Sequence, residues 1–147
     1  MIIREVMSRD VRTVSPESTV REAARLMAEA DVGALPVAAG DRLAGMVTDR
    51  DITIRATAIG KGPDTTVGEV MTHDVLYCHE DEEIEDISEN MADQQVRRLP
   101  VVDADKRLVG IVSLADIALI SDNEAAEALG GITRPGGERS QSIDGRA

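Results

Sequence analysis

The stretch Gly45-Met46-Val47-Thr48-Asp49-Arg50-Asp51-Ile52 has a close echo in Gly110-Ile111-Val112-Ser113-Leu114-Ala115-Asp116-Ile117. In each octet a glycine and apolar residues that favour a buried strand precede a hydroxyl residue. A Thr or Ser at that point caps the free backbone N–H groups of a following helix, and an acid in the first turn suits the helix dipole. Each octet therefore predicts a strand that runs directly into a helix. Caps and dipole-complementing acids alone would explain Thr48, Ser113, Asp51 and Asp116, but two octets in matching context deserve more weight than one.

The octets belong to a longer internal repeat. Val6–Val11 matches Val70–Val75, and Leu35-Pro36-Val37 matches Leu99-Pro100-Val101 at the same offset. Two copies of one unit of about 50 residues predict a duplicated fold. We expect a first copy at 1–59, a connection at 60–69, a second copy at 70–122 and a mobile polar tail at 123–147.

Each copy predicts the element order β-α-β-β-α, which is an α+β fold. In copy one, Thr19 and Glu22 fit a capping box at the start of the first helix, and Gly40-Asp41 predicts a hairpin turn. The expected elements of copy one are a strand at Val11–Val14, a helix at Val20–Ala30, strands at Ala34–Ala38 and Leu43–Val47, and a helix from Asp49 to about Ala58. Those of copy two are a strand at Val75–Cys78, a helix from about Glu83 to Gln94, strands at Leu99–Val102 and Leu108–Val112, and a helix from Leu114 to about Ile120.

The composition argues against several classes of partner. The formal net charge is −12 at pH 7, which repels nucleic acid phosphate and anionic membranes. The chain has no Phe or Trp and one Tyr, so it lacks a platform for stacking bases. Cys78 is its one cysteine, which fits a reducing compartment. With no signal-peptide pattern and no apolar run of about 20 residues, we expect a cytoplasmic protein that binds neither nucleic acid nor membrane.

Candidate metal ligands and nucleophiles are few. His73, Cys78 and His79 are the soft ligands of the chain, and they fall short of a closed zinc site. Neighbours on a strand point to opposite faces, so Cys78 and His79 should diverge, and Cys78 is better explained as a small core residue. No phosphate-binding loop and no nucleophile with an orienting base can be recognised. We therefore expect no metal site, no catalytic residues and no enzyme activity.

Taken in order, Val-Met-x-x-Asp-Val, Leu-Pro-Val and Gly-x-Val-(Thr/Ser)-x-x-Asp-Ile occur twice, and this arrangement resembles a tandem pair of CBS (cystathionine β-synthase-type) domains, the Bateman module. The resemblance covers about residues 3–120. The stretches 33–36, 48–52 and 95–100 also make the chain similar to stand-alone bacterial two-CBS-domain proteins, including the hypoxic response protein type. The resemblance implies two pseudo-twofold-related units packed sheet to sheet, with two clefts between them.

The resemblance implies that these clefts, as in many relatives, bind an adenosine-containing ligand such as AMP, ADP, ATP or S-adenosylmethionine. The family pattern places ribose hydroxyls on Asp51 and Asp116, with Thr48 and Ser113 near ribose or phosphate. It also brings residues before Leu-Pro from the opposite copy, so that Arg97 and Arg98 would face the Asp51 cleft. We therefore expect one nucleotide-competent cleft (Thr48, Asp51, Arg97, Arg98) and one poorer cleft (Ser113, Asp116). Alternatively, Arg97 and Arg98 form an exposed basic pair on an acidic surface.

The resulting functional hypothesis is a non-catalytic regulatory or sensor module that requires no cofactor and takes an adenosyl compound as a regulatory ligand. The resemblance also implies a homodimer formed through helix faces, acting on an unknown protein target. The alternative is a ligand-free structural or stress-response homodimer that works through protein–protein contacts.

Overall fold

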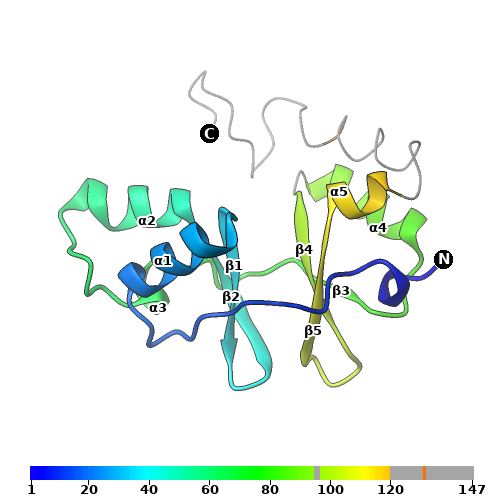
Figure 1. Cartoon of the computed structure of the whole chain (residues 1–147), viewed down its shortest axis with the longest axis horizontal. Helices are drawn as coiled ribbons and strands as arrows, with labels where there is room; N and C mark the ends of the chain where they lie inside the picture. The colour runs from blue at the N-terminus through cyan, green and yellow to red at the C-terminus, as the bar shows by residue number, and fades with distance from the viewer. Residues whose placement is uncertain (95–96, 120–130, 132–147) are drawn as a thin grey trace. The chain divides into compact units, whose positions relative to one another are not determined.

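The computed structural model describes residues 1–94, 97–119 and 131, and these form two compact units, each treated separately below (Figure 1). The first-copy unit comprises Asp10–Leu76 and Asp105–Leu108. The second-copy unit comprises Met1–Arg9, Tyr77–Ala104 and the described residues of Val109–Ala147. Among the described residues, no helix is both long enough and apolar enough to cross a membrane.

The first-copy unit is a two-stranded antiparallel sheet with helices packed against it. Strand β1 (Ala34–Ala39) pairs with β2 (Arg42–Thr48) across a turn in which Gly40 has a φ of +67°, as the predicted hairpin requires. The helical elements are α1 (Val20–Ala30), α2 (Asp49–Arg55), the 3₁₀ turn η2 (Thr57–Ile59) and α3 (Val67–Val70).

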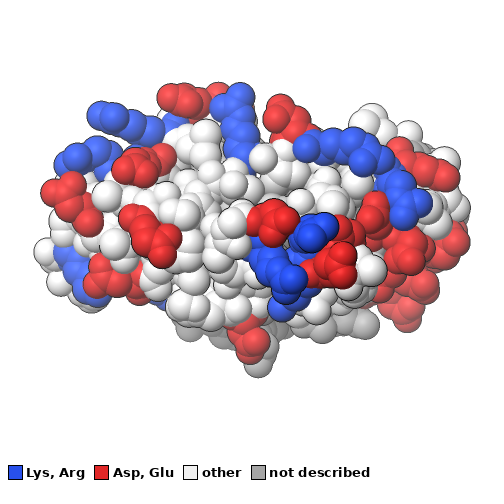
Figure 2. Space-filling view, turned by 90° about the horizontal axis from the view of Figure 1, so that it is seen from below, with Lys and Arg blue, Asp and Glu red and all other residues white. Residues whose placement is uncertain are grey.

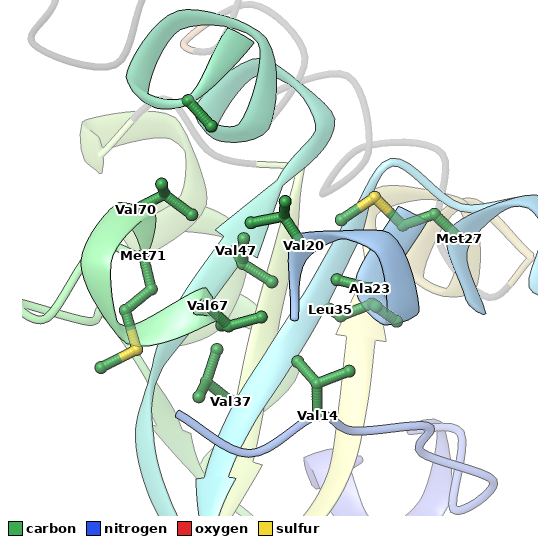
Figure 3. Close-up of a cluster of buried hydrophobic side chains, with 11 residues drawn as sticks. Val14, Val20, Ala23, Met27, Leu35, Val37, Val47, Val67, Val70 and Met71 are labelled. Carbon is green, nitrogen blue, oxygen red and sulfur yellow. The ribbon is translucent and has the colours of Figure 1, made fainter. Parts of the chain in front are cut away.

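The core of this unit lies between the helices and the sheet (Figure 3). Helix α1 turns the apolar stripe of its amphipathic sequence toward the strands, while its other face is exposed. Its cap is half of the predicted box, with Thr19 Oγ1 accepting a hydrogen bond from Glu22 N–H at 3.1 Å. The buried cluster contains Val14, Val20, Ala23, Met27, Leu35, Val37, Val47, Ala56, Val67, Val70 and Met71.

Two predicted elements of copy one are shorter than expected. The strand predicted at Val11–Val14 is wrong in extent, since only Val14 pairs with β1, through Val37. Residues 11–13 carry no strand pairing, and a turn that Ser15 and Ser18 close follows directly after Val14. The helix predicted from Asp49 to about Ala58 stops at Arg55, because Ala56 has φ −122° and ψ −70°, outside helical geometry.

The second-copy unit contains the 3₁₀ turn η1 (Ile3–Glu5), the helices α4 (Ile84–Gln94) and α5 (Leu114–Ala118), and a three-stranded sheet. The sheet order is β3 (Cys78–His79), β4 (Arg98–Val102) and β5 (Leu108–Ser113), with β3 parallel to β4. The strand predicted at Val75–Cys78 is therefore displaced and reduced to two residues. Helix α5 ends before the predicted Ile120, which, like the tail predicted at 123–147 except Gly131, lies outside the described residues.

The residues that open each sequence copy belong to the unit of the other copy. Thr72 exchanges two backbone hydrogen bonds with Met46 of β2, at 2.8 and 3.0 Å. In the same way, Ser8 exchanges two with Ile111 of β5, at 2.9 and 3.0 Å. The opening segment of each copy is therefore part of the compact unit built by the other copy. The repeat boundaries at 1–59 and 70–122 describe the sequence copies and stay a prediction.

A glycine makes each of these pairings possible. A Cβ at Gly45 would lie 2.6 Å from the Thr72 carbonyl oxygen, and a Cβ at Gly110 would lie 2.9 Å from that of Ser8. These distances are shorter than real Cβ contacts, and the neighbour is backbone that cannot move aside cheaply. The glycine that begins each octet is thus required by packing.

We predict that Gly45→Ala destabilises the protein by about 1–3 kcal/mol, because the added methyl group overpacks the Met46–Thr72 pairing. Urea unfolding monitored by circular dichroism measures the effect. The control is Gly62→Ala, where the added Cβ would meet nothing within 4 Å and the change should stay within about 0.5 kcal/mol. Equal unfolding midpoints for the two variants would contradict the packing argument.

Candidate functional site

Thr48 and Asp51 form a reciprocal capping box at the start of α2. Thr48 Oγ1 accepts a hydrogen bond from Asp51 N–H at 3.0 Å, and Asp51 Oδ2 accepts one from Thr48 N–H at 2.9 Å. The Asp51 side chain is 14% exposed, so the carboxylate is held against the protein and still reaches solvent. The cap predicted from the octet is confirmed, and it fixes the orientation of the carboxylate.

Ser113 and Asp116 build the same corner at the start of α5. Ser113 Oγ accepts from Asp116 N–H at 3.2 Å, and Asp116 Oδ2 accepts from Ser113 N–H at 2.8 Å. The two corners therefore match atom for atom in their caps. We call them the Asp51 corner and the Asp116 corner.

At the Asp51 corner the two carboxylate oxygens have different surroundings. Oδ2 of Asp51 is engaged in the cap, whereas Oδ1 is 4.0 Å from Arg55 Nε, which is longer than a hydrogen bond. A carboxylate has about four acceptor positions on its two oxygens, so Oδ1 keeps the capacity to accept donors such as hydroxyl groups. The arrangement is chemically suited to bind a hydroxyl-bearing ligand without disturbing the helix start.

The structure ties the second residue before each Leu-Pro to the second helix of its own copy. Arg97 C=O accepts a hydrogen bond from Leu114 N–H at 2.9 Å, as Gly33 C=O does from Asp49 N–H at 2.9 Å. Arg97 and Arg98 are exposed and belong to the second-copy unit, together with the Asp116 corner. Asp51 belongs to the first-copy unit. The predicted contribution of Arg97 and Arg98 to the Asp51 cleft stays a prediction.

Arg55 is a residue near the candidate site that the sequence analysis missed. Its Nη1 donates to the carbonyl oxygens of Val70 and Met71, at 3.2 and 3.3 Å. It lies one turn after Asp51 on α2, a spacing that permits an ion pair on a helix surface. That spacing was the available signal, but the carbonyl partners are far away in sequence and could not be inferred from it.

Cys78 and His79 diverge as the strand pattern predicted, with Cys78 buried and His79 exposed. Cys78 Sγ lies 3.7 Å from the Pro100 carbonyl oxygen. Burial, aided by the charge of Glu82, raises the pKa of the Cys78 thiol to about 12. The described part of the chain contains no group of three or more His, Cys, Asp and Glu side chains placed to hold a metal ion.

The acidic run Glu80–Glu83 serves local structure. Acidic side chains gather at the right-hand end of the face shown in Figure 2. Glu82 Oε2 accepts from His79 N–H at 3.0 Å, and Glu80 pairs with Arg4 at 2.8 Å. These contacts fit a solvated helix start.

A CBS domain family model matches the chain twice, at residues 3–56 and 67–122. The two matches include both octets and both corners. The chain belongs to the CBS domain family and carries the α+β fold of a tandem CBS pair, as its sequence motifs indicated.

Two relatives share most of their length with this chain. The CBS domain-containing protein YhcV of Bacillus subtilis (strain 168) is 44% identical over 133 residues, which are 89% of this chain and 94% of YhcV. Hypoxic response protein 1 of Mycobacterium tuberculosis (strain CDC 1551 / Oshkosh) is 44% identical over 117 residues, which are 78% of this chain and 81% of the relative.

Three solved structures with the same fold hold ligands. That of Hypoxic Response Protein I, with two coordinated zinc ions, has a TM-score of 0.75 at 41% identity and covers 82% of this chain and 99% of its own. That of CBSX2 in complex with AMP has a TM-score of 0.72 at 29% identity, covering 80% and 93%. The CBS domain pair of protein MJ0100, in complex with 5′-methylthioadenosine and S-adenosyl-L-methionine, has a TM-score of 0.71 at 27% identity, covering 84% and 98%.

We predict that Cys78 is inert to thiol reagents in the folded protein. At pH 8, four units below a pKa of about 12, about one thiol in ten thousand is ionised, and the thiolate is the reactive form. Because the shift raises the pKa, the reaction of folded protein with Ellman's reagent should accelerate about tenfold per pH unit between pH 8 and 9. Protein unfolded in guanidinium chloride serves as the control and should react rapidly. Equal rates for folded and unfolded protein at pH 8 would contradict the burial of the thiol.

Proposed function

We propose that this CBS pair is a non-catalytic sensor module that binds an adenosine-containing ligand, AMP, ADP, ATP or S-adenosylmethionine, at its Thr/Ser-x-x-Asp corners. The observation that carries the proposal is at the Asp51 corner, where Oδ2 is engaged in the cap and Oδ1 keeps the capacity to accept a ligand hydroxyl group. The relatives CBSX2 and MJ0100, in complex with AMP and with S-adenosyl-L-methionine, support this class of ligand.

The chemistry of a ribose fits the Asp51 corner. A cis-diol offers two hydroxyl donors, and an ionised carboxylate forms stronger hydrogen bonds than a neutral acceptor does. Thr48 and Asp51 already hold each other in place, so binding costs little reordering of side chains. Within this proposal, Thr48 and Asp51 contact the ribose of one ligand, and Ser113 and Asp116 form a second, weaker site.

We further propose that Arg97 and Arg98 contact the phosphate of the ligand bound at the Asp51 corner. The support is in the sequence: two guanidinium groups precede Leu99-Pro100, while Gly33-Ala34 precedes the equivalent Leu-Pro of copy one. Guanidinium groups bind phosphate through two parallel hydrogen bonds. This asymmetry favours a phosphorylated ligand at one corner.

The module acts without catalysis and needs no cofactor in this proposal. Its match to YhcV covers 94% of that protein, which leaves little room there for a separate catalytic domain. The ligand therefore regulates rather than reacts, and the regulated target is another protein.

We predict that AMP at about 100 times its Kd stabilises the protein by about 2.7 kcal/mol, a Tm rise of about 5–10 °C. Asp51→Asn should abolish most of this rise, because the Asn oxygen keeps the cap while its NH₂ group replaces an acceptor by a donor. Thermal melts with AMP, ATP and S-adenosylmethionine measure the shift.

Two matched controls accompany the melts. Asp49→Asn makes the same charge change on the same helix, and Asp116→Asn makes the same change at the second corner. Both should keep most of the rise. The absence of any shift for wild type with all three ligands at millimolar concentration would refute the proposal.

A second candidate function is action through protein contacts as a homodimer, favoured by exposed apolar side chains on one segment. Ile54 is 48% exposed and Ile59 is 65% exposed, on α2 and on the 3₁₀ turn that follows it. Large apolar residues exposed together often mark an association surface. In this candidate a second copy of the chain covers them, whether or not a ligand binds.

We predict that the double variant Ile54→Glu, Ile59→Glu is monomeric, because two carboxylates cannot be buried unpaired in an interface. Sedimentation velocity over a range of protein concentrations measures the state. Thr13→Glu, which adds a charge at another exposed position, is the control and should leave the dimer intact. A monomeric wild type, or a double variant that still dimerises, would rule out this surface.

A further inference from the structure

We infer that Arg55 is a positioning residue that couples occupancy of the Asp51 corner to the segment Val70–Thr72, which opens the second sequence copy. The inference rests on the proposed function and adds a route by which a bound ligand alters the protein. Every residue it uses belongs to the first-copy unit.

Arg55 holds the end of α3 through backbone acceptors. Its Nη1 donates to Val70 C=O at 3.2 Å and to Met71 C=O at 3.3 Å. The last carbonyl groups of a helix lack partners within the helix, so α3 ends with acceptors that a cation can satisfy. Hydrogen bonds from a charged donor are about twice as strong as neutral ones. The two bonds from Arg55, which we call the Arg55 clasp, therefore fix the path of the chain at residues 70 and 71.

The same guanidinium faces the free oxygen of the candidate site. Asp51 Oδ1 is 4.0 Å from Arg55 Nε, while Oδ2 is occupied by the cap. With Arg55 about half exposed and a separation of 4.0 Å, the ion pair is weak, so a ligand hydroxyl can take Oδ1 from it. Once the ligand does so, the carbonyl oxygens of Val70 and Met71 are the acceptors left to Arg55, and the clasp tightens.

The segment that the Arg55 clasp holds also contacts the strand that leads to the Asp51 corner. Thr72 N–H bonds to Met46 C=O of β2 at 2.8 Å, and β2 leads directly into Thr48 and the cap. Val67, Val70 and Met71 lie beside Val47 in the buried cluster (Figure 3). A change at the Asp51 carboxylate therefore reaches the segment from two sides, through α2 and Arg55 and through β2.

The second copy has no equivalent donor in its sequence. The octet alignment that matches Asp51 with Asp116 matches Arg55 with Ile120, which cannot donate a hydrogen bond from its side chain. The coupling is thus a property of the Asp51 corner alone. A ligand at the Asp116 corner should leave the exchange of residues 70–72 unchanged.

Amide hydrogen exchange of the full chain, with and without saturating AMP, tests the coupling. In wild type, AMP should slow exchange at Met71 and Thr72 by at least about fivefold, a typical coupling between sites. Arg55→Gln should lose this slowing and, by thermodynamic reciprocity, bind AMP more weakly by about the same factor. Arg50→Gln, the same charge change on the same helix, should behave as wild type. Arg55→Lys, which keeps the charge without the planar fork, should show an intermediate slowing.

The outcomes separate the coupling from the proposed function. If wild type binds none of AMP, ATP and S-adenosylmethionine, the proposed function and the coupling both fail. If wild type binds AMP and Arg55→Gln shows the same slowing, the coupling alone fails. Should Arg55→Gln not fold, Arg55→Lys decides the matter, since a slowing equal to that of wild type would overturn the role of the guanidinium fork.

Discussion

The backbone pairing between the opening segment of each copy and a strand of the other copy is the constraint on which the structure depends. At Thr72 and Met46, and again at Ser8 and Ile111, two hydrogen bonds join segments that are far apart in sequence. Each pairing requires a glycine on the strand, because a side chain would overlap the approaching carbonyl oxygen. The glycine, the strand and the cap of each octet are therefore set by backbone geometry before any ligand is considered.

Local signals in the sequence predicted the elements that depend on local physics. Caps at Thr48 and Ser113, the hairpin at Gly40 and the amphipathic first helix were all identified, since each depends on residues within one or two turns. The short strands were misjudged because their length depends on how long a neighbouring strand runs alongside. Val14 finds a partner in β1 for one residue only, and no pattern within residues 11–14 records that limit.

The same reasoning explains how much of the candidate site could be predicted. The cap geometry of Asp51 and Asp116 follows from a spacing of three residues, so the sequence predicted that both acids lie in the first turn of a capped helix. The Arg55 contacts depend on where the end of α3 lies, which is a tertiary fact. What the Arg97 and Arg98 side chains contact also depends on tertiary structure. The hydrogen bond that the structure gives Arg97 uses its backbone carbonyl oxygen, which any residue would supply.

The two corners share a cap and differ in what surrounds it, and this difference carries the functional argument. An acid at the third position of a helix is explained by the cap alone, so Asp51 and Asp116 are not by themselves evidence for a ligand. The carboxylate oxygen that the cap does not use is the informative one. At Asp51 the second oxygen faces Arg55, whereas the octet alignment puts Ile120 at the equivalent position of copy two. A duplicated frame with identical caps and unequal charges is suited to binding one ligand strongly at one corner. Because Arg55 donates to the carbonyl oxygens of Val70 and Met71, our proposal places the response to a ligand at the start of the second copy.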